Sequence, residues 1–110
     1  MNIDLKGWQE DFYRWVGGDL GTVRETIEHA ITHGVHVEVT TLIIPGRNDS
    51  AADMDAEARW LASLSPEIPL HISRYFPRHR VSTPPTPAAA IDRLAEIARR
   101  HLRHVHHGNC

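Results

Sequence analysis

Polar and apolar residues alternate along several short stretches of the chain, which predicts β-strands with one face buried and one face open. Side chains of a strand point alternately to its two faces, so Asp4 and Lys6 share one face of the first stretch, and Ile3 and Leu5 share the other. The stretches expected to form strands are residues 3–6, 35–44, 68–75 and 104–107. The second stretch alternates first and then becomes continuously apolar at 42–44, which favours a strand that goes from half-buried to fully buried.

The segments between these stretches carry apolar residues at spacings of three and four, which predicts helices. An extra short helix after the first strand is indicated by an aromatic stripe of Trp8, Phe12 and Trp15. Capping residues mark the other helices. The first of them is expected to begin at a T-x-x-E capping box at 22–25 and to end at a glycine at 34. The second is expected to begin at a capping box at 50–53 and to end at 65–66. The third is expected to begin at 86–87, with a threonine N-cap and a proline at N1.

Strands that alternate with helices predict a parallel sheet with its strands side by side in sequence order. A doubly wound sheet carries helices on both faces and would make the strands apolar on both sides. The consistent polar face therefore favours an α/β fold: a partial (β/α) barrel segment of about four parallel strands in sequence order, with helices on the outer face. Residues 1–110 are expected to form a single unit.

Composition excludes several classes of partner. The net charge of −2 gives no electrostatic basis for binding nucleic acid or an anionic membrane. No apolar run approaches the ~20 residues of a membrane helix, and the N-terminal residues show no secretory signal. The single cysteine, Cys110, excludes an internal disulfide and indicates a reducing, cytoplasmic location.

Three polar residues on the predicted open face are candidates for binding chemistry. Asp4 and Lys6 place a carboxylate beside an ammonium, which suits a zwitterionic ligand or a cation; the alternative is a partly exposed ion pair of little energetic value. His71 lies mid-strand on the same face, either as a ligand contact or as a structural histidine.

Two further regions leave a functional and a structural interpretation open. The segment 45–49 (PGRND) follows the carboxyl end of a strand, where parallel α/β proteins carry active sites, but its composition equally suits a turn with a helix cap. His29 and His33 have the i, i+4 spacing that can chelate zinc, and more histidines cluster near the C-terminus. A solvated surface rich in His and Arg is the alternative, and we predict no metal ligands.

Taken in order, the segments IDLKG, THGVHVEVTTLIIPGRND and IPLHISRYFP resemble the C-terminal half of a radical SAM enzyme. The resemblance is to the pyruvate formate-lyase activating enzyme group, in its AmmeMemoRadiSam branch, and covers residues 2–109. It implies a partial barrel whose lumen holds a [4Fe–4S] cluster and S-adenosylmethionine. By this resemblance Asp4, Leu5, Lys6 and His71 contact S-adenosylmethionine, and none of them is assigned a catalytic role.

The chain departs from this family at the cluster. The family binds its cluster through three cysteines in a C-x3-C-x2-C loop, and Cys110 alone cannot replace them. We therefore expect this chain to be a fragment or one half of a split protein, with Met1 at the position where the middle of a full-length family member would be. Its expected partner is the missing N-terminal barrel half or another protein, and the activating enzymes suggest a protein substrate. From their position in the loop after the third strand, Arg74, Arg78 and His79 are candidates to face a substrate or a partner.

Alone, the chain is expected to be marginally stable or self-associating, and inactive. Two other functions stay open at this stage: a non-catalytic half-barrel that docks on a partner, and a histidine-rich metal-binding protein.

Overall fold

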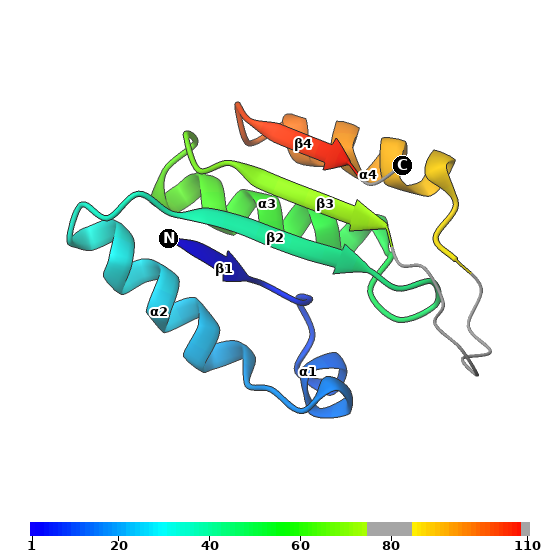
Figure 1. Cartoon of the computed structure of the whole chain (residues 1–110), viewed down its shortest axis with the longest axis horizontal. Helices are drawn as coiled ribbons and strands as arrows, with labels where there is room; N and C mark the ends of the chain where they lie inside the picture. Colours follow the sequence, from blue (N-terminus) through cyan, green and yellow to red (C-terminus); the bar gives the residue numbers. More distant parts are fainter. Residues whose placement is uncertain (75–84, 109–110) are drawn as a thin grey trace.

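A computed structural model describes residues 1–74 and 85–108, which form a four-stranded parallel sheet with helices (Figure 1). The strands lie in sequence order, β1-β2-β3-β4, as the alternation of strands and helices predicted. Their bounds are β1 (Asn2–Asp4), β2 (Glu38–Ile43), β3 (Leu70–Arg74) and β4 (Val105–Gly108). The predicted α/β fold with parallel strands in sequence order is confirmed.

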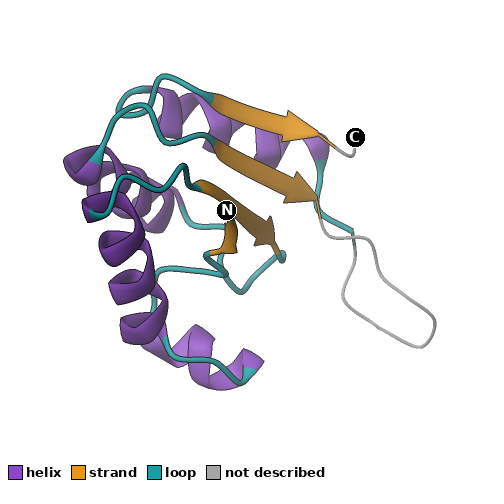
Figure 2. Cartoon of the chain, turned by 60° about the vertical axis from the view of Figure 1, so that its left-hand side comes forward, coloured by secondary structure: helices purple, strands orange, loops and turns teal. Residues whose placement is uncertain are grey.

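The helices are α1 (Glu10–Val16), α2 (Leu20–Thr32), α3 (Ala51–Leu64) and α4 (Ala88–Arg99). Figure 1 shows α3 and α4 behind the sheet and α2 beside β1, and Figure 2 shows helices behind the strands, to their left and below them. In the described part of the chain, no helix covers the front face. None of these helices is long and apolar enough to cross a membrane.

The core fills the space between the sheet and the helices behind it. One in-register row of the sheet consists of Ile3, Val39, Leu70 and Val105, and Val39 and Leu70 are fully buried. Ile91, Leu94 and Ala98 of α4 are also fully buried. The aliphatic face of the strands therefore lies under the helices, and the other face remains open.

Two predicted helix starts are wrong by one or more residues. Asp19, not Thr22, is the N-cap of α2, and Thr22 lies in the first turn, where its Oγ1 donates to Asp19 Oδ2 at 2.6 Å. Pro87 is the N-cap of α4, because the Thr86 hydroxyl instead donates to the carbonyl of Ile43 at 2.5 Å. By contrast, Ser50 caps α3 as predicted, since its Oγ accepts the Asp53 N–H at 3.0 Å.

The predicted burial of the end of β2 is also wrong. Leu42 is 41% exposed, whereas Ile43 is fully buried. The strand continues to alternate, and Leu42 points to the open face, where the described chain supplies no second layer to cover it. The predicted aromatic stripe is interrupted as well, because α1 begins at Glu10 and Trp8 lies before it.

Trp8 instead packs across the chain against α3. Its ring lies 5.5 Å from that of Trp60, and the Arg24 guanidinium lies 4.7 Å from the Trp8 ring and 4.9 Å from the Trp60 ring. This cation–π cluster joins the segment after β1 to α2 and α3. Most of the predicted loop 76–85, with Arg78 and His79, lies outside the described residues.

A buried carboxyl group lies between the sheet and α3. Glu57 is 2% exposed, and its Oε2 lies 2.9 Å from Thr41 Oγ1, which is also 2.7 Å from the carbonyl of Leu5. Burial raises the pKa of Glu57 to about 8, while the hydrogen bond with Thr41 opposes the shift. A hydroxyl has one proton to give, so the protonated Glu57 donates to Thr41 while Thr41 donates to the Leu5 carbonyl. A charged Glu57 would instead accept the Thr41 hydroxyl, and this is the form in which the hydrogen bond lowers the pKa of Glu57.

Glu57 predicts a loss of stability as the pH rises. The folded-state pKa lies above the ordinary value of 4.5, so the folded chain keeps a proton that the unfolded chain releases. The stabilisation is complete below about pH 4.5, falls by up to about 1.4 kcal/mol per pH unit as the pH rises, and is lost once the pH has passed through 8. Glu57→Gln should remove this slope, because its amide donates to Thr41 without titrating.

The measurement is urea unfolding of both proteins between pH 5 and pH 9. Glu28→Gln, on the exposed face of α2, is the matched control and should keep the wild-type slope. Equal slopes in the wild type and in Glu57→Gln would contradict the prediction.

Candidate functional site

One row of polar side chains crosses the open face of the sheet. The register pairs Asp4 with Thr40, Thr40 with His71, and His71 with His106. Because side chains directly across a ladder share a face, these four residues form a continuous polar row. Two of the residues selected from the sequence, Asp4 and His71, thus lie on this face with Thr40 between them.

A pocket of about 250 Å³ lies where β1 and β2 end. It is lined by Asp4, Lys6, Phe12, Thr40, Leu42 and Ile44. A carboxylate and an ammonium therefore share a pocket whose remaining walls are mostly apolar. The Leu5 side chain is fully buried in the core on the other face, so only its backbone lies near this pocket.

Lys6 lies beyond the last ladder residue of β1, and other elements hold its backbone in place. Its N–H donates to the hydroxyl of Tyr13 at 2.7 Å, and its carbonyl accepts from Asn48 Nδ2 at 2.7 Å. Burial raises the pKa of Tyr13, although the hydrogen bond from Lys6 opposes that rise. The side chain of Lys6 therefore starts from a fixed backbone.

Asn48 is the residue of the PGRND segment that joins this segment to both strands. Its side chain is 6% exposed; Nδ2 donates to the carbonyls of Lys6 and Leu42, and Oδ1 accepts the Ile44 N–H at 2.6 Å. Gly46 makes the turn with φ 75°, and its N–H donates to Asp49 Oδ2 at 3.1 Å. The segment is thus a turn that also fixes the ends of both strands beside the pocket.

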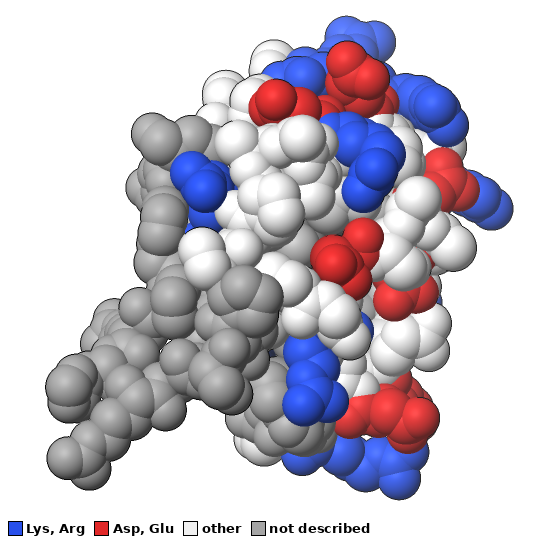
Figure 3. Space-filling view, turned by 90° about the vertical axis from the view of Figure 1, so that its right-hand side faces the viewer, with Lys and Arg blue, Asp and Glu red and all other residues white. Residues whose placement is uncertain are grey.

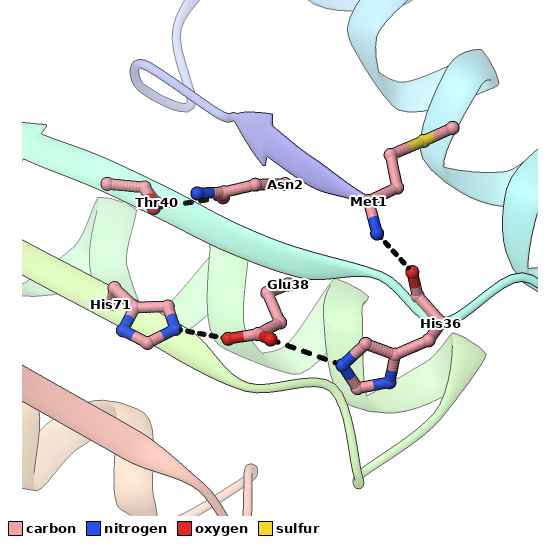
Figure 4. Close-up of polar contacts among 6 residues, drawn as sticks. All are labelled: Met1, Asn2, His36, Glu38, Thr40 and His71. Atoms are coloured by element: carbon pink, nitrogen blue, oxygen red, sulfur yellow. Dashed lines mark hydrogen bonds and ion pairs between the residues drawn. The ribbon is translucent and has the colours of Figure 1, made fainter.

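His71 belongs to a second group of side chains, farther along the polar row. Its Nε2 donates to Glu38 Oε1 at 2.7 Å, and His36 Nε2 donates to Glu38 Oε2 at 3.2 Å (Figure 4). The hydrogen bonds from His71 and then from His36 lower the pKa of Glu38. The His71 ring also stacks on His106, with centroids 5.0 Å apart and planes 24° apart.

A second, more open pocket of about 430 Å³ lies over these residues. Its lining includes Asn2, Glu38, Thr40, His71, Ser73 and His106. Thr40 lines both pockets, so the two are adjacent on the same face of the sheet. Together they extend from Lys6 at the end of β1 to His106 in β4.

The other histidines do not form a metal site in the described chain. Within residues 1–74 and 85–108, no three His, Cys, Asp or Glu side chains are grouped to share a metal ion. His29 and His33 stack on each other at 4.1 Å, and His33 Nδ1 lies 2.8 Å from the carbonyl of His29. Near the C-terminus, His101 pairs with Asp55 at 2.7 Å and His104 with Glu67 at 2.9 Å.

Arg74, at the end of β3, donates from Nε to the carbonyl of Thr86 at 2.9 Å. Figure 3 shows the end of the molecule towards which the strands run, with acidic and basic side chains interspersed over its described part. This distribution agrees with the small net charge of −2.

Sequence reasoning missed the roles of Glu38, Asn48, Glu57 and His106. The available signal for Glu38 is its position between Val37 and Val39, which puts it on the polar face of an alternating strand. His106 belongs to the histidine cluster near the C-terminus of the sequence, but its position opposite His71 depends on strand register.

Comparisons with known proteins found similarity both in sequence and in fold. No protein-family model matches the chain. An uncharacterised protein of Methanocaldococcus jannaschii is 38% identical over 113 residues, which cover 99% of this chain and 34% of that protein. The chain therefore spans about a third of the length of this relative.

Two solved structures share the fold. A domain of a pyruvate-formate lyase-activating enzyme from Bacteroides vulgatus superposes with a TM-score of 0.82 and 19% identity, over 98% of this chain and 66% of that one. A radical SAM methyltransferase from Sphaerobacter thermophilus gives a TM-score of 0.72 and 19% identity, over 99% and 34%. The chain thus shares its fold with a domain of the first protein and with part of the second.

Asn48→Ala should destabilise the chain by about 2–4 kcal/mol, because it leaves the Lys6 and Leu42 carbonyls and the Ile44 N–H without their side-chain partner. Asp49→Ala is the matched control, since its side chain accepts the exposed Gly46 N–H, and the loss of this bond should cost less than about 1 kcal/mol. Urea unfolding measures both values, and equal costs for the two substitutions would contradict the role given to Asn48.

Proposed function

We propose that this chain is the C-terminal portion of a radical SAM enzyme, of the pyruvate formate-lyase activating type and its AmmeMemoRadiSam branch, and that Asp4, Lys6 and His71 contact S-adenosylmethionine. The observation that carries the proposal is the pocket at the carboxyl ends of β1 and β2, which holds one carboxylate and one ammonium. Parallel α/β folds bind their ligands at this edge.

The donor set suits the amino-acid end of S-adenosylmethionine. A ligand with both an ammonium and a carboxylate finds an opposite charge for each, in Asp4 and Lys6. Phe12, Leu42 and Ile44 offer apolar walls to the uncharged part of the ligand. The Leu5 side chain, buried in the core, supports the strand and takes part in binding only through its backbone.

His71 lies next in the polar row and is suited to a hydrogen bond with the more distant part of the ligand. S-adenosylmethionine supplies the radical chemistry of this class when it is bound with a cluster. The residues of this chain bind and orient it, through two fixed charges and one imidazole.

The residues of this chain do not fit the [4Fe–4S] cluster. Such clusters need a set of thiolates, and the sequence has one cysteine. We infer that the cluster ligands come from a preceding segment or from a partner protein, and that these 110 residues are inactive alone. The 34% coverage of the M. jannaschii relative supports this inference. The single cysteine also favours a cytoplasmic location.

The free edge of β1 is the docking site that we propose for the rest of the barrel. The Met1 carbonyl accepts from the Glu38 N–H, and the Leu5 N–H donates to the Thr40 carbonyl, so alternate residues of β1 bond to β2. The amides of Asn2 and Asp4 between them face outward, where another strand can pair. The same edge supports the second candidate function, a non-catalytic half-barrel that docks on a partner.

The single lysine gives a direct test of S-adenosylmethionine binding. Reductive methylation with ¹³C-formaldehyde labels Lys6 and the Met1 amine and keeps their charges. Addition of S-adenosylmethionine should shift the Lys6 signal saturably and leave the Met1 signal unchanged, because Met1 N lies at the other end of β1, bonded to the His36 carbonyl. Asp4→Asn should weaken binding roughly tenfold.

The control variant is Glu96→Gln, on the exposed surface of α4, which should bind as the wild type does. A Lys6 signal that does not move at millimolar S-adenosylmethionine would contradict the proposed site. A signal that moves equally in Asp4→Asn would remove Asp4 from it.

The free edge of β1 predicts that the isolated chain self-associates. Sedimentation velocity should show a mass that rises with concentration, and Asn2→Pro should reduce it, because proline removes the outward N–H. Asn2→Ala loses only the side-chain bond from Thr40 and is the matched control. A wild-type chain that stays monomeric at every concentration would oppose edge docking.

A further inference from the structure

We propose that Glu38 is a positioning residue for His71: it accepts the Nε2–H of the imidazole and leaves Nδ1 as the ring nitrogen that faces the ligand. The ligand must then present a hydrogen-bond donor, a hydroxyl or an amine, at that point. The identity of the ligand rests on the proposed function, but the fixed tautomer does not.

The geometry places Glu38 on one side of the ring. Glu38 Oε1 lies 2.7 Å from His71 Nε2, and Figure 4 shows Nδ1 on the opposite side of the ring. Both residues line the open pocket of about 430 Å³, which leaves space beside the imidazole for a ligand.

Glu38 is itself held in place by a second contact. His36 Nε2 lies 3.2 Å from the other carboxylate oxygen, so both oxygens of Glu38 have partners. The neighbouring Thr40 hydroxyl donates to Asn2 Oδ1 at 3.2 Å, away from Glu38. The carboxylate therefore has its orientation set by His36 and has no competing donor in Thr40.

The stack with His106 limits the other movement open to His71. The two rings lie 5.0 Å apart at 24°, which disfavours rotation of the imidazole out of the row. A ring flip would also break the hydrogen bond to Glu38. The two contacts together select one orientation of the ring.

The protonation state of Glu38 decides which ring nitrogen of His71 carries the proton. Hydrogen bonds from His71 and His36 lower the pKa of Glu38, so at neutral pH it is a carboxylate, which only accepts hydrogen bonds. A neutral His71 beside it must carry its proton on Nε2. Its Nδ1 then has a lone pair and accepts a hydrogen bond from the ligand.

The first test is the tautomer of His71, read by ¹⁵N chemical shifts of the histidine rings at a pH where they are neutral. In the wild type His71 should populate the Nε2–H form, and in Glu38→Ala it should become a mixture. His71→Gln assigns the signal, and Glu67→Ala, which removes the partner of His104, should leave it unchanged. Circular dichroism checks that each variant is folded.

The second test is the affinity for S-adenosylmethionine, measured on the same variants. Glu38→Ala should weaken binding about fivefold, and Glu38→Ala combined with His71→Gln should be no weaker than His71→Gln alone. If the wild type does not bind S-adenosylmethionine, the proposed function fails, and the tautomer still decides the role of Glu38.

Two results would overturn the inference. One is a wild-type His71 that carries its proton on Nδ1, or a tautomer that Glu38→Ala does not change. The other is unchanged affinity in Glu38→Ala where His71→Gln loses binding, which would show that Glu38 does not act through His71.

Discussion

The candidate site depends on three side-chain hydrogen bonds that hold the backbone of β1 beyond its ladder. Thr41 donates to the Leu5 carbonyl, Asn48 donates to the Lys6 carbonyl, and Tyr13 accepts the Lys6 N–H. The ladder itself ends at Asp4. Without these bonds Lys6 would lie in an unpaired segment, and its distance from Asp4 would not be defined. The three bonds come from β2, from the turn that precedes α3 and from α1, so the position of Lys6 depends on how α1 and this turn dock on the strands.

The second constraint is the single layer of helices. Right-handed connections between parallel neighbours place successive helices on the same side of the sheet. The other side is then free to carry polar groups, and parallel register aligns them across the strands. With neighbouring strands ~4.8 Å apart, the row from Asp4 through Thr40 and His71 to His106 spans roughly 14 Å. That length matches an extended small molecule better than a single ion.

Much of this arrangement could be predicted from the sequence, because it follows from local patterns. Alternation placed Asp4, Lys6 and His71 on one face, and the box that begins at Ser50 predicted the start of α3. The predictions that failed concern burial, which a local pattern does not determine. Leu42 looked buried because it is apolar, but burial depends on whether another layer exists. Glu57 interrupts an apolar helix face, and a glutamate there is normally assigned to solvent.

Contacts across strands were beyond sequence reasoning for a physical reason. The pairing of Glu38 with His71 and the stack of His71 on His106 depend on strand register, which the alternation fixes only to within two residues. Asn48 shows the same limit. The composition of segment 45–49 predicted a turn, but only the fold shows which carbonyls the Asn48 amide reaches.

The tryptophan pair gives the molecule an optical property. The Trp8 and Trp60 rings lie 5.5 Å apart and tilted by 45°, close enough for their electronic transitions to couple. A coupled pair gives an exciton signal in circular dichroism that disappears when the rings separate. Trp8 follows Lys6 by two residues, so this signal would follow the undocking of the segment that carries the lysine in real time, without any added label.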